Sequence, residues 1–251
     1  MFLFCRKYIK SMLKPFFSAL LFLCAYTVGH AQLNNASVFF HSGIQFKNNN
    51  QLPEAITAFN KALTLNKKFD SAYVELGHVY VKTGQIDNSI SHFKKALLLN
   101  PTYTEALMAM GKIYKELKQN LDSALFYYSA AAKIDVANKE IFYGLAWTYN
   151  AKKDYDKAIT NAIEVLKIDN TYRLAYGELG HAYRYSKKYA EGIEQFKKNL
   201  AVSVVDLALL FSGFCYTELN DKTGAMQQYE ALKKINEKMA ASLKKKIDSM
   251  Q

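Results

Sequence analysis

The chain has 251 residues, and its 33 lysine and arginine residues outnumber its 22 aspartate and glutamate residues, which gives a formal net charge of +11. Half of the residues are apolar, 18 are tyrosine and 16 phenylalanine, whereas only 3 are proline and 11 glycine. This composition excludes a disordered chain and favours a packed, helical protein.

The first 31 residues differ in kind from the rest. A basic stretch that includes Arg6 and Lys14 is followed by an uncharged apolar run over residues 15–28 and then by small residues up to Ala31. This order is typical of a secretory signal peptide, and the run is shorter than the roughly 20 apolar residues of a membrane span. We therefore expect export to the periplasm, the cell envelope or the exterior, with cleavage after Ala31 and no stable membrane insertion afterwards. An uncleaved anchor is the alternative.

The stretch 70–103 contains two amphipathic segments, 72–82 and 86–100, whose apolar residues recur at helical spacing. Gly84 lies between them, where a helix stop belongs, and Pro101 prevents the second helix from continuing. The sequence therefore predicts a helical hairpin that needs a neighbour to cover its apolar face.

Other parts of the chain repeat this hairpin in phase. The position of Gly77 recurs as Gly43, Gly111, Ala146, Gly180 and Gly213, and that of Tyr80 as Phe46, Tyr114, Tyr149, Tyr183 and Tyr216. The position of Ser89 recurs as Ala55, Ala124, Ala158, Gly192 and Ala225, and that of Phe93 as Phe59, Tyr128, Ala162, Phe196 and Tyr229. Small residues let the two helices approach closely, and the aromatic rings fill the space around that contact.

This pattern resembles the tetratricopeptide repeat, in which two helices recur about every 34 residues. The resemblance implies an all-α, right-handed α-α superhelix, or solenoid, of about six helical hairpins. Within residues 32–237 we expect the repeats at about 36–69, 70–103, 104–138, 139–172, 173–205 and 206–237. The fourth copy departs at Ala146 and Ala162, and the fifth carries Asn199 where alanine is expected.

The last 14 residues, 238–251, place Met239, Leu243 and Ile247 on one helical face and three lysines around the other. Stacked repeats need a terminal element that is apolar inside and polar outside. We expect this segment to be a C-terminal capping helix.

Catalytic motifs are absent from the sequence. It has no glycine-rich phosphate loop, nucleophile elbow or paired-histidine zinc helix, and His41, His78, His92 and His181 lie in different copies. We therefore expect no enzyme activity, no cofactor and no metal site.

The resemblance further implies a partner-binding groove, because first helices line the concave face of such solenoids. Aromatic rings beside lysine and arginine suit an extended peptide, since rings supply contact area and cations bind carboxylates. The corresponding positions are Val74, His78, Met108, Lys112, Lys115, Tyr143, Trp147, Asn150, His181, Arg184 and Tyr185. Trp147 and Tyr143 have a second interpretation, in which they pack between neighbouring first helices.

The sequence thus predicts a non-enzymatic scaffold of the cell envelope that binds another protein or peptide through an extended segment on the concave face. The first alternative is a purely structural solenoid that forms a homo-oligomer or bridges subunits. An enzyme with a dispersed site and an anionic-surface binder are further alternatives, the latter because signal removal leaves 29 basic and 22 acidic residues, a charge of +7. No specific nucleic-acid binding is expected.

Overall fold

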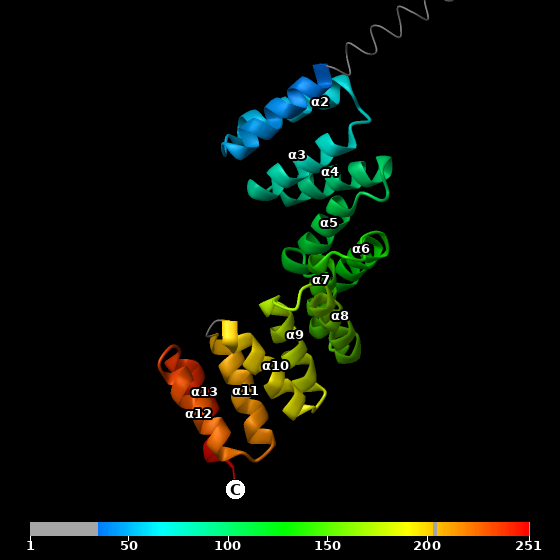
Figure 1. Cartoon of the computed structure of the whole chain (residues 1–251). Coiled ribbons are helices and arrows are strands. Elements are labelled where there is room, and N and C mark those ends of the chain that lie inside the picture. The colour runs from blue at the N-terminus through cyan, green and yellow to red at the C-terminus, as the bar shows by residue number, and fades with distance from the viewer. Residues whose placement is uncertain (1–34, 203–204, 251) are drawn as a thin grey trace, which may run out of the picture. The chain divides into compact units, whose positions relative to one another are not determined.

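The computed structural model describes residues 35–202 and 205–250. The predicted signal peptide lies outside these residues. Among the described residues there is no strand, and helices follow one another throughout (Figure 1). The chain divides into two compact units between Ala106 and Leu107, within helix α5 (Thr104–Glu116).

The described part of the first unit contains four successive helices before α5. Residues 35–48 are helical, and they are followed by α2 (Leu52–Leu65), α3 (Asp70–Lys82) and α4 (Ile86–Leu99). Helix α3 packs on both α2 and α4. Its buried residues Leu76 and Val79 join Phe59 of α2 in one apolar core.

The second unit continues the alternation of helices. It contains the rest of α5, α6 (Leu121–Ile134), α7 (Lys139–Ala151), α8 (Tyr155–Ile168), α9 (Arg173–Tyr185), α10 (Tyr189–Val202), α11 (Asp206–Glu218), α12 (Lys222–Lys233) and α13 (Glu237–Asp248). Each helix from α6 onward packs on the next, and α7, α9, α11 and α13 also pack in succession. Helix α13 therefore covers α11 and α12 as a cap, through the buried Ala240, Leu243 and Ile247. The predicted all-α fold of stacked hairpins with a capping helix is confirmed.

Close packing inside the hairpins explains the repeated glycines. A Cβ atom on Gly77 would lie 2.8 Å from a ring carbon of Phe93, and one on Gly180 would lie 2.7 Å from Phe196. Each ring thus rests directly on the backbone of the first helix. Full burial of one such ring stabilises the fold by about 1.5–3 kcal/mol.

The turns inside the hairpins share one backbone feature, a residue with positive φ. These residues are Asn50, Gly84, Gln119, Lys153, Lys187 and Asn220. A left-handed residue at this place ends a helix and lets the chain reverse. Some helix starts are capped by side chains: the Asn138 carboxamide accepts from Glu140 N in α7, and the Asp221 carboxylate accepts from Gly224 N in α12.

Candidate functional site

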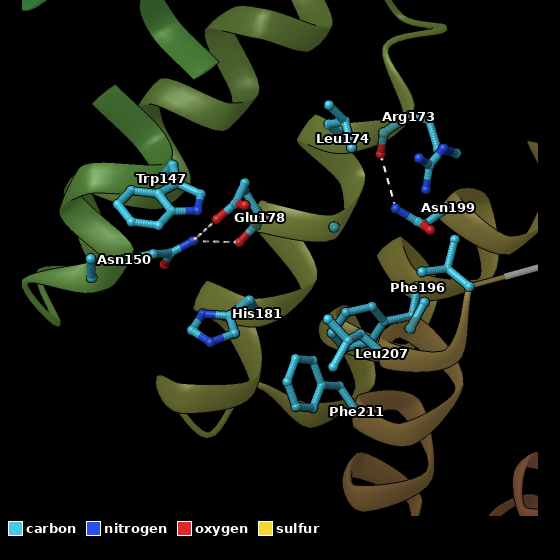
Figure 2. Close-up of a pocket in the computed structure, with 14 residues that line it drawn as sticks. Trp147, Asn150, Arg173, Leu174, Glu178, His181, Phe196, Asn199, Leu207 and Phe211 are labelled. Carbon is cyan, nitrogen blue, oxygen red and sulfur yellow. Dashed lines mark hydrogen bonds between the residues drawn. The ribbon is translucent and has the colours of Figure 1, made fainter. Parts of the chain in front are cut away.

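A cleft of about 400 Å³ opens in the second unit and is lined by residues of α7, α9, α10 and α11. Figure 2 shows Trp147 of α7 on one side of α9, and Leu207 and Phe211 of α11 on the other. Most of its wall is apolar, with a few polar groups among the rings. A cleft of this volume with an apolar wall and a few polar groups is typical of ligand sites.

Asn150 and Glu178 form the polar end of the cleft near Trp147. Asn150 Nδ2 donates to the Glu178 carboxylate at 2.8 Å and to the Glu178 carbonyl at 3.0 Å (Figure 2). Asn150 is 6 % exposed, and its Oδ1 has no hydrogen-bond partner among the described residues. Burial raises the pKa of Glu178, while the Asn150 hydrogen bond and the Lys115 charge act in the opposite direction.

Asn199 of α10 supplies a second carboxamide at the other end of α9. Its Nδ2 donates to the carbonyl of Arg173 at 3.0 Å (Figure 2). The residue is 4 % exposed, and its Oδ1 has no partner in the described part of the chain. Because Nδ2 bonds to a carbonyl, the amide orientation is fixed, and Oδ1 can only accept. Both residues line the cleft, but each Oδ1 atom is itself fully buried and without a donor among the described residues.

Trp147 lies beside both the cleft and helix α5. It lines the cleft, and Lys115 Nζ lies 4.9 Å from its ring centroid. The same ammonium lies 5.7 Å from the Tyr143 ring and 3.2 Å from the Glu116 carboxylate, so Lys115 is only 9 % exposed. Burial raises the pKa of Tyr143 to about 12. Trp147 thus lines the cleft and also contacts a side chain of the neighbouring first helix α5.

His181, Arg184 and Tyr185 lie together near the end of α9. The Arg184 guanidinium lies 4.6 Å from the Tyr185 ring and 5.0 Å from the Phe211 ring. Burial, and to a lesser extent the Arg184 charge, lowers the pKa of His181. His181 Nδ1 and Arg184 Nη1 have no partner among the described residues. Only His181 of these three lines the cleft.

The remaining predicted groove residues are placed elsewhere. Val74 is 1 % exposed, so it packs inside the first unit rather than facing a partner. His78, in the same unit, bonds to the Glu105 carboxylate at 3.0 Å. In the second unit Lys112 is exposed, while Met108 accepts a hydrogen bond from Asn138 at 3.7 Å. The structure therefore brings together Trp147, Asn150 and His181 at the cleft and leaves these four residues outside it.

Several lining residues were not predicted from the sequence. They are Arg173, Leu174, Gly177, Phe196, Asn199, Leu207 and Phe211, whereas Glu178 was among the partner-facing positions that the repeat pattern gave. One feature of the sequence pointed to Gly177: it occupies the repeat position that Val74, Met108 and Tyr143 occupy in preceding copies. Asn199 was visible as a departure from alanine, but its place beside a cleft was not.

No group of three or more His, Cys, Asp or Glu side chains in the described ranges is arranged to hold a metal ion. None of the described helices combines the length and the apolar character that crossing a membrane requires.

Comparison with known proteins gives one family match and several structural ones. The model of the tetratricopeptide repeat protein 21 C-terminal ARM domain matches residues 27–179. The PilF structure of Pseudomonas aeruginosa matches at 14 % identity and a TM-score of 0.71, covering 86 % of this chain and 99 % of PilF. No curated protein matches.

Two further solved structures match over about two thirds of the chain. MamA is 23 % identical with a TM-score of 0.62, covering 66 % of this chain and 91 % of MamA. YrrB, a tetratricopeptide repeat protein with an unusual peptide-binding site, is 22 % identical with a TM-score of 0.62, covering 68 % of this chain and 88 % of YrrB. At these identities the likeness establishes a common fold.

Proposed function

The chain belongs to the family of the tetratricopeptide repeat protein 21 C-terminal ARM domain, and from that premise we propose that it is a non-enzymatic scaffold that binds an extended segment of another protein. The binding site is the cleft over α9. The observation that carries this proposal is the mostly apolar cleft of about 400 Å³, whose wall includes the rings of Trp147, Phe196 and Phe211.

A protein segment matches the apolar lining of this cleft. Its apolar side chains offer contact area to Trp147 and Phe211. Leu174 and Leu207, at the rim, are 41 % and 46 % exposed, which extends the apolar contact beyond the cleft. The peptide-binding site of YrrB supports the same use of this fold.

The chemistry of the lining supports binding rather than catalysis. No serine, threonine, cysteine, tyrosine or lysine is among the described residues that line it. Its one carboxylate, Glu178, is held by Asn150, and its one imidazole, His181, has a lowered pKa. A nucleophile with an adjacent base, which covalent catalysis needs, is therefore not part of this lining.

We place this scaffold in the cell envelope. The support is the basic, apolar and small-residue order of residues 1–31. N-terminal sequencing of the protein isolated from its native cells tests this step. A sequence that begins at Gln32 agrees with export and cleavage, and a chain that begins at Met1 or Met12 in the cytosolic fraction contradicts them.

Site-specific photo-crosslinking in the native cells tests the binding function. A photoreactive amino acid is placed at Leu174 or at Leu207, and the matched control is Val136, which is 71 % exposed and lies between α6 and α7. We expect both rim positions to crosslink to one segment of another protein, and the control position not to do so. Crosslinks only between two copies of the chain, or equal crosslinking from Val136, would contradict the proposal.

A further inference from the structure

Two arginines of α9, Arg173 and Arg184, carry charges that no carboxylate neutralises in the described part of the chain. Asn199 bonds to the main-chain carbonyl of Arg173 and leaves its guanidinium without a partner. The Arg184 guanidinium has no ion pair or hydrogen bond with any described residue, and its Nη1 is buried. Both residues are half-buried, so each charge has lost part of its hydration without gaining a counter-charge.

The carboxylates of α9 and α11 are engaged elsewhere. Each is bonded to another residue: Glu178 to Asn150 at 2.8 Å, Asp206 to Asn236 at 2.9 Å, and Glu218 to Lys246 at 3.0 Å. These two helices therefore leave the two arginines open to an anion from a partner.

The two arginines lie on the same face of α9, one at each end of the cleft. They are about three helical turns apart, which is roughly 16 Å along the helix axis. Gly177 and His181 lie between them on this face, and Arg173 itself lines the cleft (Figure 2). Gly177 has no side chain, which keeps the cleft open along α9. The Arg184 guanidinium lies 5.0 Å from the ring of Phe211, which forms part of the cleft wall.

Aromatic rings hold the Arg184 guanidinium in place. It lies 4.6 Å from the Tyr185 ring, 5.0 Å from the Phe211 ring and 5.1 Å from the Phe214 ring. An arginine that packs on ring faces keeps the N–H groups at the edge of its guanidinium available for a carboxylate. Because Nη1 is the nitrogen buried without a partner, the other nitrogens are the ones that reach a bound anion.

The spacing of the two cations distinguishes between anionic partners. Between them the cleft is mostly apolar and contains the carboxylate of Glu178. A nucleic-acid strand carries a phosphate at every nucleotide, so it would place further phosphates over this stretch without cations to meet them. A fatty acid brings one carboxylate for two arginines. A protein segment can carry two carboxylates with apolar side chains between them, and roughly 16 Å corresponds to about five residues of extended chain.

We propose that Arg173 and Arg184 select a partner segment that carries two acidic residues about five positions apart, with apolar side chains between them in the cleft. Each carboxylate binds one guanidinium. The inference rests on the proposed binding function and adds the charge pattern of the segment that the cleft selects.

Trp147, the only tryptophan of the chain, reports on this site through its fluorescence. The full chain is titrated with pools of tryptophan-free, end-blocked peptides that carry random Leu, Phe, Ala and Ser except at two positions about five residues apart. These two positions are both Glu, both Gln or both Lys. We expect the Glu pool to bind about tenfold more tightly than the Gln pool at low salt, and the Lys pool to bind most weakly. The preference for Glu should shrink as salt is added.

Two variants assign this preference to the arginines. Arg173→Gln and Arg184→Gln should each reduce the Glu-over-Gln preference about threefold. The matched control is Lys133→Gln, which removes a charge from an exposed position of α6 outside the cleft and should retain the preference. An unchanged preference in both arginine variants overturns the proposal. If Arg184→Gln does not unfold cooperatively on heating, Arg173→Gln and the three pools decide the outcome.

The outcomes separate this inference from the function on which it rests. Equal binding of the Glu and Gln pools overturns the charge selection and leaves peptide binding in place. Binding of no pool overturns both. A single-stranded oligothymidylate or laurate that binds more tightly than the Glu pool assigns the arginines to another anion and overturns the proposal. A two-chain mass by light scattering that Arg173→Gln returns to one chain assigns the cleft to a second copy and also overturns it.

Discussion

Replacement of Asn199 by alanine should stabilise the protein, although the residue is 4 % exposed and hydrogen-bonded. The substitution removes one hydrogen bond to the Arg173 carbonyl, which costs about 0.5–1.5 kcal/mol. It also removes an Oδ1 that is buried without a donor, a defect that costs about 1–3 kcal/mol. The amide borders an open cleft, so its loss enlarges that cleft instead of leaving a sealed void. The balance favours Asn199→Ala by about 1 kcal/mol.

Differential scanning calorimetry of the unliganded chain measures this effect, and an increase of about 1 kcal/mol corresponds to about 2–4 °C in the melting temperature. The matched control is the reverse change in α6, Ala131→Asn, at the equivalent repeat position, where alanine is fully buried. That control should lose about 1–3 kcal/mol, because it buries a carboxamide without an assigned partner. A loss of 1 kcal/mol or more in Asn199→Ala would refute the reasoning, since Asn199 Oδ1 would then have a partner in the free protein.

Three further predictions concern the same unit. Gly180→Ala should lower the free energy of unfolding by about 1–3 kcal/mol, because its Cβ would meet the Phe196 ring at 2.7 Å. An unchanged midpoint of chemical denaturation would contradict the contact between the Phe196 ring and the Gly180 backbone. Glu178→Gln should raise the free energy of unfolding at pH 7 and leave it unchanged below the pKa of a solvated glutamate. Burial raises the Glu178 pKa, so the charged form is the destabilised one, and Asn150 can still donate to the glutamine carbonyl. Melting curves across this pH range measure the effect, and a variant that is less stable than the wild type at pH 7 would disprove it. Burial raises the pKa of the Cys215 thiol to about 12. Alkylation at pH 8, followed peptide by peptide, should therefore leave Cys215 unmodified until the chain unfolds. Rapid labelling of Cys215 in the native protein would be inconsistent with this.

The hairpins were predictable from the sequence because their packing repeats. The glycine at position 77 and the ring at 93 recur together, and the structure shows that ring resting on that glycine. Gly84 was predicted to end a helix and has φ of +74° in the turn. The equivalent turns at Lys153 and Lys187 also have positive φ without glycine, and no local signal marks them. Their conformation follows from the packing of the two helices that they join.

The cleft was only partly predictable. Trp147, Asn150 and His181 were proposed from their repeat positions, and all three line it. Gly177 also lines the cleft, but it has no side chain that could mark it as a residue that contacts a partner. Asn199 was noted as a departure from alanine, but the hydrogen bond that orients it depends on the Arg173 carbonyl, which only the structure places beside it.

The central claim is that an extended partner segment occupies the cleft over α9. The segment recovered from crosslinks at Leu207 can be synthesised as a peptide, and its effect on collisional quenching of Trp147 fluorescence in the full chain can be measured. The account predicts that the peptide shields Trp147 from acrylamide in the wild type and not in Gly177→Met. Equal quenching with and without bound peptide, or equal shielding in the variant, would contradict it.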